Sequence, residues 1–187
     1  CGSTFCIVEC QHTGSGSGDR GNGKGDKGND FKRKKGYKLS QNKEVLNEYS
    51  LFNNLCVPVA LTYINKFFGG EVGPEFYIGE YNVIPGKENE NVFENGFIIT
   101  IPQLTQFVNK YFYTTDFISY VNAIDSGYLV MVSIDGGDGV LHNIVIVGYY
   151  PDGTLIYMDP MSTTLKEDSG NNMNGSYVYV ITGNKDK

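Results

Sequence analysis

The amino-acid sequence predicts an α+β fold with two lobes, in which a group of helices precedes a sheet of antiparallel strands. Three observations support this class. Apolar residues in the first half recur at helical spacing, as at Val57, Leu61 and Ile64. The second half contains short apolar runs separated by turn signals, of which Asp152-Gly153 is the strongest hairpin signal. Helices and strands are also segregated along the chain, which argues against a parallel sheet built from βαβ units.

The main helix is expected at residues 56–68. Pro58 suits its first turn, where the missing N–H has no helical partner to lose, and Gly69-Gly70 ends it. Residues 71–96 are rich in Gly, Pro, Asn and Glu and are expected to form a long loop. The remaining helices are expected at residues 43–48, 101–112 and 118–125, and the strands at residues 128–134, 142–150, 154–158 and 177–182.

The chain is predicted to consist of an N-terminal extension and one domain. Residues 1–38 form a cysteine-containing head followed by a Gly-rich flexible tether, which cannot bury enough apolar area to offset its ordering entropy. Residues 39–187 form the domain, and about 150 residues are enough for a hydrophobic core. No apolar run approaches the roughly 20 residues of a membrane-spanning helix, so no transmembrane span is expected.

Charge and sequence motifs limit the classes of partner and cofactor that can be expected. The formal net charge of the chain is −6. Residues 19–38 carry 8 basic and 3 acidic side chains, a net charge of +5, so the remaining residues carry −11. Such an acidic domain does not favour nucleic acid as a partner. No cofactor is expected, because two G-x-G-x-x-G matches lie in the tether without a preceding strand or a following helix. No metal site is expected either, since the spacing of Cys1, Cys6, Cys10 and His12 matches no common zinc site.

The first residues suggest where the protein resides. Cys1-Gly2-Ser3 is what remains when a bacterial lipoprotein signal is cut before an acylated cysteine. We therefore expect an extracytoplasmic bacterial protein, secreted or tethered to the surface, with a lipid anchor at Cys1 as one interpretation. The other interpretation is a domain excised from a longer polypeptide.

Two residues of the predicted domain have the chemistry of a nucleophile and its base. Cys56 begins the main helix, where the helix dipole lowers the pKa of a thiol and favours the thiolate. The alternative is a small buried core residue. His142 is the one histidine in the predicted domain, and imidazole can hold and deliver a proton near neutral pH. The alternative here is a strand-edge histidine bonded to the backbone.

Asp159 is a candidate partner for His142. It ends the strand expected at residues 154–158, and a carboxylate that accepts the imidazole N–H would fix the tautomer of the ring. The alternative is a turn aspartate before proline. A two-residue hairpin at Asp152-Gly153 would pair Asp159 with Ile146, on the same face as His142 but four residues away, about 13 Å at ~3.3 Å per residue. Coiling or a bulge must close this gap.

Several segments resemble papain-fold cysteine peptidases, in particular their bacterial C39-like group. The nucleophile segment of that group resembles residues 53–61 (NNLCVPVAL), and its histidine strand resembles residues 141–149 (LHNIVIVGY). The turn and third catalytic residue that follow are similar to residues 152–153 (DG) and 157–160 (YMDP). The helix–Gly–strand unit that precedes the histidine strand is similar to residues 123–131. The resemblance covers roughly residues 39–183 and rests on the order and spacing of these segments.

The resemblance implies a papain-like fold with a cleft between the lobes, and hydrolysis of peptide bonds in a peptide or protein substrate. Cys56 would form the acyl-enzyme, His142 would protonate the leaving amine, and Asp159 would orient His142. The backbone N–H of Cys56 and one side chain would bind the oxyanion. The family usually has Gln about six residues before the nucleophile, where this chain has Ser50, so Asn54 is the candidate side chain.

Three functional hypotheses follow from the sequence. The first is a cysteine peptidase with a Cys-His-Asp triad. The second is a toxin effector domain that uses the same triad. The third is a non-catalytic papain-like module that binds a peptide, and the departures at Ser50 and at Val57, where these peptidases often have Gly, leave room for it.

Overall fold

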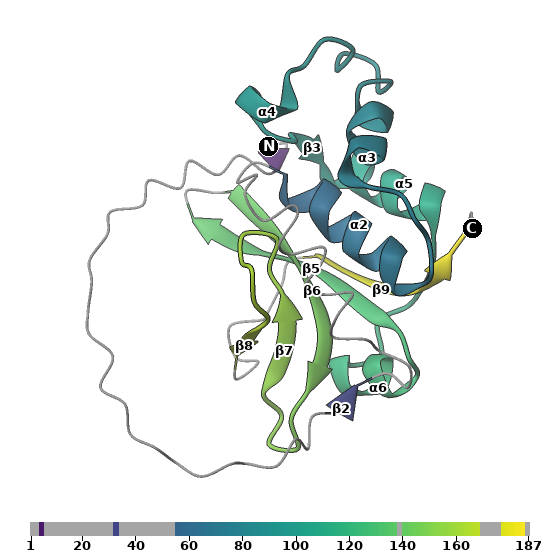
Figure 1. Ribbon diagram of the computed structural model, residues 1–187, viewed down its shortest axis with the longest axis vertical. Helices are drawn as coiled ribbons and strands as arrows, with labels where there is room; N and C mark the ends of the chain where they lie inside the picture. The colour runs from purple at the N-terminus through teal and green to yellow at the C-terminus, as the bar shows by residue number, and fades with distance from the viewer. Residues whose placement is uncertain (1–3, 6–31, 34–54, 138–139, 169–176, 186–187) are drawn as a thin grey trace.

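The computed structural model describes residues 4–5, 32–33, 55–137, 140–168 and 177–185 (Figure 1). Helices precede the main strands along the chain, so the predicted α+β class is confirmed. The helical lobe contains α2 (Cys56–Phe67), α3 (Pro74–Tyr81), α4 (Val92–Asn95) and α5 (Ile101–Tyr111). The helix expected at residues 43–48 and the domain start expected near Leu39 lie outside the described residues.

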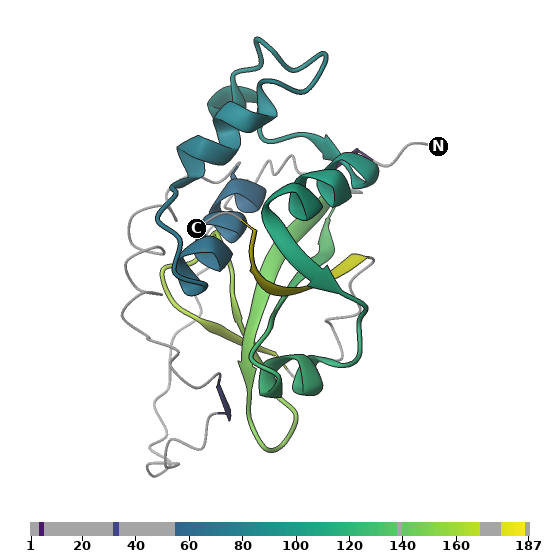
Figure 2. The same ribbon diagram turned by 90° about the vertical axis from the view of Figure 1, so that its right-hand side faces the viewer.

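The sheet lobe is built on one sheet with the strand order β4-β9-β5-β6-β7-β8, and every pair in it is antiparallel. Its strands are β4 (Phe112–Thr115), β5 (Leu129–Gly137), β6 (Val140–Tyr149), β7 (Leu155–Met158), β8 (Lys166–Asp168) and β9 (Tyr177–Asn184). The short helix α6 (Tyr120–Asp125) lies at the opposite end of the molecule from α3 and α4 in both views (Figures 1 and 2).

Two short strands near the N-terminus contact the domain. β1 (Thr4–Phe5) pairs with β3 (Ile99–Thr100) beside the helical lobe. β2 (Lys32–Arg33) pairs with the end of β6 at Tyr149 and Gly148. The division of the chain at residue 38 stays a prediction.

Helix α2 is buried on all sides. Its residues from Cys56 to Asn65 are all buried, because the helix packs against α3 on one side and β6 on the other. The helix ends where the two glycines predict. Gly69 adopts a φ of +84°, which glycine reaches without strain, and its N–H donates to the carbonyl of Lys66.

The prediction of a long loop over residues 71–96 is wrong in part, because the segment contains α3 and α4. Pro74 is in the first turn of α3, where proline is tolerated. The helix is short and includes Gly79, which weakened its signal in a segment rich in loop-forming residues. Its buried positions nevertheless follow the i, i+3, i+4, i+7 spacing of one helical face: Pro74, Tyr77, Ile78 and Tyr81.

Helix α5 begins with a capping box. The backbone N–H of Gln103 donates to Thr100 Oγ1, and the backbone N–H of Thr100 donates to Gln103 Oε1 at 2.9 Å. The helix ends at Tyr111, one residue before the predicted end, and Phe112 begins β4. The chain therefore passes from the helical lobe into the edge of the sheet without a loop.

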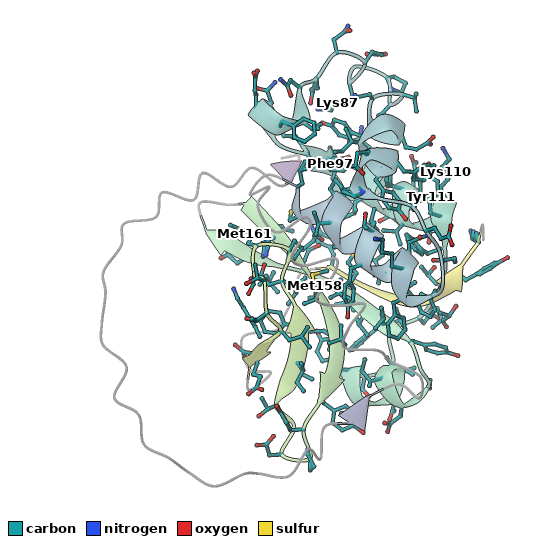
Figure 3. The ribbon with its side chains drawn as sticks, in the orientation of Figure 1. Lys87, Phe97, Lys110, Tyr111, Met158 and Met161 are labelled. Carbon is teal, nitrogen blue, oxygen red and sulfur yellow. The ribbon has the colours of Figure 1, made fainter. Side chains whose placement is uncertain are left out.

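The hydrophobic core lies on both faces of the sheet. The larger cluster joins α2 and the other helices to Val145 and Val147, and the smaller joins α6 to Ile144 and Ile146. Alternate residues of β6 thus pack on opposite faces. Figure 3 shows Phe97 and Tyr111 in the helical lobe, and Met158 and Met161 in the sheet lobe. Among the described residues, no helix has the length and apolar character needed to cross a bilayer.

Candidate active site

Cys56 is the first residue of α2 and is 1% exposed. Its sulfur is disulfide-bonded. The other cysteines of the sequence, Cys1, Cys6 and Cys10, lie outside the described residues. A sulfur in a disulfide has no thiolate, and Cys56 can therefore become a nucleophile only after reduction.

The hairpin between β6 and β7 lies where the sequence predicts it, but its loop is longer than expected. The backbone N–H of Tyr150 donates to the carbonyl of Thr154 at 2.8 Å, and these two residues close the loop. The loop therefore contains residues 151–153, and the prediction of a two-residue loop at Asp152-Gly153 is wrong. With three residues in the loop instead of two, the pairing would place Asp159 level with Val145 instead of Ile146, one residue nearer to His142.

A bulge in β6 moves the register further. The pairing of β6 with β7 shifts by one residue beyond Ile146. Continuing the shifted register places Asp159 level with Ile144, two residues from His142, instead of level with Ile146. Residues two apart on neighbouring strands are diagonal neighbours at roughly 7–8 Å between Cα atoms, within reach of long side chains. The gap that the flat ladder left is closed by these two features.

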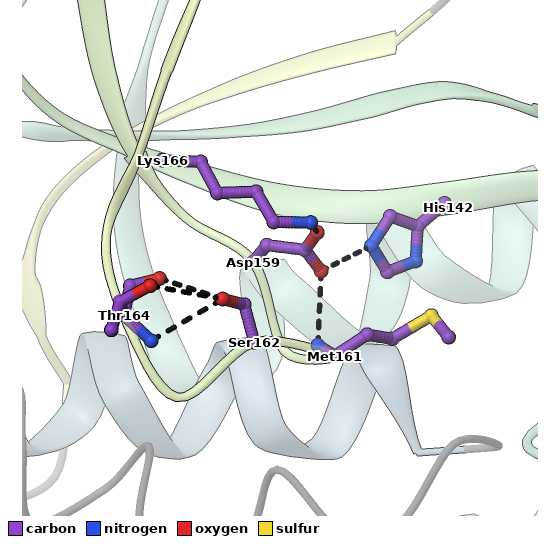
Figure 4. Close-up of polar contacts among 6 residues, drawn as sticks. All are labelled: His142, Asp159, Met161, Ser162, Thr164 and Lys166. Atoms are coloured by element: carbon purple, nitrogen blue, oxygen red, sulfur yellow. Dashed lines mark hydrogen bonds and ion pairs between the residues drawn. The ribbon is translucent and has the colours of Figure 1, made fainter. Parts of the chain in front are cut away.

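His142 and Asp159 meet at this position (Figure 4). His142 Nε2 lies 2.7 Å from Asp159 Oδ1, and the two side chains are 9% and 10% exposed. The second ring nitrogen, Nδ1, is buried and has no hydrogen-bond partner among the described residues. An ionised carboxylate can only accept, so Nε2 carries the hydrogen that joins the pair, and Nδ1 of the neutral ring is free to accept a proton.

Asp159 has two further donors. The backbone N–H of Met161 donates to the same oxygen, Oδ1, at 2.9 Å. Lys166, the first residue of β8, donates from Nζ to the other oxygen, Oδ2, at 2.5 Å. Lys166 is not among the residues predicted from the sequence, because β8 was not predicted either. The signal available was a turn-forming Ser162-Thr163-Thr164 run between Asp159 and a lysine, which is compatible with a chain reversal.

The environment of Asp159 contains opposing electrostatic effects. Burial raises the pKa of the carboxyl, because it disfavours the charged form. The hydrogen bond and charge of His142, the hydrogen bond from Lys166 and the N–H of Met161 act in the other direction and are stronger together. The pKa of Asp159 therefore lies well below its usual value, and the carboxylate is ionised at any pH where the protein would work.

This shift predicts how acid affects stability. Because the pKa of Asp159 is lower in the folded chain than in the unfolded chain, its contribution to stability is complete above the unfolded value of about 3.9 and is lost as the pH falls further. Asp159→Asn is expected to lose less stability than the wild type between pH 6 and pH 3. Urea unfolding at both pH values measures the difference, with Asp116→Asn as the surface control; equal losses in Asp159→Asn and wild type would contradict it.

The oxyanion candidate Asn54 lies outside the described residues, as does Ser50. The backbone N–H of Cys56 belongs to the first turn of α2, whose N–H groups have no intrahelical acceptor and favour negative charge. In the described part of the chain, no group of three or more His, Cys, Asp or Glu side chains could hold a metal ion.

Comparison with known proteins identifies the family. The model of the Peptidase_C39 like family matches residues 36–185, which is most of the chain. Searches of curated proteins and of solved structures gave no significant match. The family match and the arrangement of helices and strands agree on a papain-like α+β fold. A peptidase-type function with a peptide or protein substrate follows from the family, and the chain belongs to the C39-like peptidases.

Proposed function

We propose that the protein is a cysteine peptidase in which Cys56 is the nucleophile, His142 the acid and base, and Asp159 the residue that orients His142. The observation that carries the proposal is the His142–Asp159 pair, with Nε2 bonded to the carboxylate and Nδ1 buried and unpartnered among the described residues. Strand β6, which carries His142, packs against α2, the helix that Cys56 begins. A base with one nitrogen held and the other free is what a thiol nucleophile requires.

In the proposed reaction, Nδ1 of His142 takes the thiol proton of reduced Cys56, and the thiolate attacks the carbonyl carbon of the peptide bond. The oxyanion is bound by the backbone N–H of Cys56 and, we propose, by Asn54. The imidazolium then protonates the leaving amine, the C–N bond breaks, and a thioester remains on Cys56. Water attacks the thioester while Nδ1 takes its proton, and the thiol leaves with that proton.

Alternating residues of β6 constrain how the sulfur and the imidazole meet. Val145 and Val147 pack on the face of the sheet that α2 covers, and Ile144 and Ile146 pack on the other face. Because side chains alternate along a strand, His142 belongs to the same face as Ile144 and Ile146. His142 is the third residue of β6 and Cys56 the first residue of α2. The proposal therefore requires the two side chains to meet near the start of β6, beyond its last pair with β7 at Val145, and not across the face of the sheet.

Alkylation of the thiol tests the proposal. A variant with Cys1, Cys6 and Cys10 changed to serine leaves Cys56 as the single cysteine. A peptide analogue with a thiol-alkylating group should label it with one adduct, at a rate that remains high at pH 6, because a thiolate paired with imidazolium persists below the ordinary thiol pKa of about 8.5. Adding Cys56→Ser should abolish the adduct. Labelling that rises only near pH 8.5, as in urea-unfolded protein, would contradict the proposal.

A second candidate is a non-catalytic papain-like module that binds a peptide. The disulfide at Cys56 favours it, because a bonded and buried sulfur also fits a structural role. The same experiment separates the two functions. The module predicts an ordinary thiol after the partner cysteines are removed, and it predicts that peptides bind without being cleaved.

A further inference from the structure

We propose that Lys166 is a positioning residue that fixes the carboxylate of Asp159 and, through it, the ring of His142. The inference rests on the proposed function, because it concerns the orientation of the proposed base. Lys166 Nζ lies 2.5 Å from Asp159 Oδ2, while Oδ1 of the same carboxylate faces His142 Nε2 at 2.7 Å. The lysine, the carboxylate and the imidazole thus form one chain of charge-assisted contacts (Figure 4).

The turn between Asp159 and Lys166 is built to return the lysine to the carboxylate. The N–H of Ser162 donates to the backbone carbonyl of Asp159 at 2.9 Å. Ser162 Oγ then accepts from the N–H of Thr164 at 3.2 Å and donates to the carbonyl of Thr164 at 2.9 Å. The chain reverses, and Lys166 pairs with Tyr157 of β7, two residues before Asp159. Lys166 is therefore held by backbone pairing and does not depend on the ion pair for its place.

The two oxygens of Asp159 have separate partners, which restricts rotation of the carboxylate. Oδ1 accepts from Met161 N–H and faces His142, and Oδ2 accepts from Lys166. The side chain of Asp159 is 10% exposed, whereas that of Lys166 is 44% exposed. The lysine thus reaches from the surface to a buried carboxylate. Without its ammonium group, Oδ2 loses the partner that holds the plane of the carboxylate toward the imidazole.

Lys166 also offsets the negative charge that His142 faces. Asp159 faces the ring with one oxygen and the ammonium group of Lys166 with the other, so the lysine compensates part of the carboxylate's charge. Tyr157 on β7 is an ionisable group close enough to interact with Lys166 and Asp159, and Asp168 on β8 also acts on it. Burial raises the pKa of Tyr157, Lys166 lowers it, and Asp159 and Asp168 raise it further, so this phenol stays neutral in the working pH range. Removing the lysine should therefore leave the carboxylate, and with it the imidazole ring, less firmly held.

Imidazole NMR tests this without relying on activity. The chain has two histidines, so His12→Gln leaves one imidazole signal to follow. In that variant, with Cys56→Ser to remove the thiol, Lys166→Met should make the Nε2–H proton exchange with water about tenfold faster, because its bond to Asp159 is less firmly held, and Lys166→Arg should leave the exchange rate near the starting value. An unchanged exchange rate in Lys166→Met would overturn the inference, even if the protein proves not to be a peptidase.

Kinetics of the reduced enzyme provide the second measurement. Lys166→Met should lower kcat about ten- to hundredfold with little change in KM, because the ring is misplaced while the substrate contacts remain. Lys166→Arg should restore most of the loss. Lys87→Met is the matched control, since Lys87 also pairs with a carboxylate, Glu90, at 2.8 Å, but in the helical lobe. Equal kcat in both methionine variants, with wild-type turnover intact, would overturn the positioning role and leave the proposed function standing.

Discussion

Protein purified without a reductant is expected to show no turnover of a peptide substrate, and a dithiol is expected to restore it. The reason is that Cys56 is disulfide-bonded, and the proposed attack needs a thiolate. The dithiol attacks the disulfide, two protein thiols form, and the dithiol closes into its own disulfide, so electrons and protons balance. The measurement is the cleavage rate of a fluorogenic peptide before and after reduction, with free thiols counted in parallel.

A variant with Cys1, Cys6 and Cys10 replaced by serine gives the control for this prediction. It removes every partner available within the chain, so it should be active without a reductant. Mass spectrometry of a non-reducing digest identifies which of the three bonds to Cys56. Full turnover by wild-type protein whose thiols remain oxidised would contradict the prediction and the role of Cys56 together.

The second large effect is expected from His142→Ala, which should lower kcat/KM by about 10²–10⁴-fold, the usual contribution of a general acid or base. The variant loses the nitrogen that takes the thiol proton and the imidazolium that protonates the leaving amine. It should still fold, because Asp159 retains its bonds to Lys166 and Met161 N–H.

The other histidine provides a matched control. His12→Ala removes the same side chain from the predicted N-terminal head and should leave kcat/KM of the reduced enzyme unchanged. Circular dichroism and a urea midpoint check that His142→Ala is folded. A folded His142→Ala enzyme with wild-type kcat/KM would exclude the imidazole from the reaction.

Local signals predicted the elements that frame the site. The apolar spacing of α2 and its glycine stop depend on neighbours within one or two turns, and the short apolar runs of β5, β6, β7 and β9 are equally local. Helix α3 was missed although its buried face has helical spacing, because it spans only eight residues and contains Gly79. In so short a helix, tertiary packing contributes more than intrinsic propensity.

The distance between His142 and Asp159 could not be predicted from local signals. It depends on a three-residue loop and on a bulge beyond Ile146, and neither has a distinct mark in the sequence. One residue of register moves a side chain by about 3.3 Å along the strand, so two such shifts decide whether the pair meets. Lys166 was missed for a related reason, since its place depends on pairing between β7 and β8.

The position of β9 has a consequence for how the protein is made. This strand inserts between β4 and β5, pairing Ile181 with both Thr114 and Leu129. Those two neighbours are synthesised well before it, and until residues 177–184 leave the ribosome each presents an open edge. Assembly of the sheet must therefore wait until residues 177–184 have been synthesised, and fragments that stop short of Tyr177 should aggregate through the exposed edges.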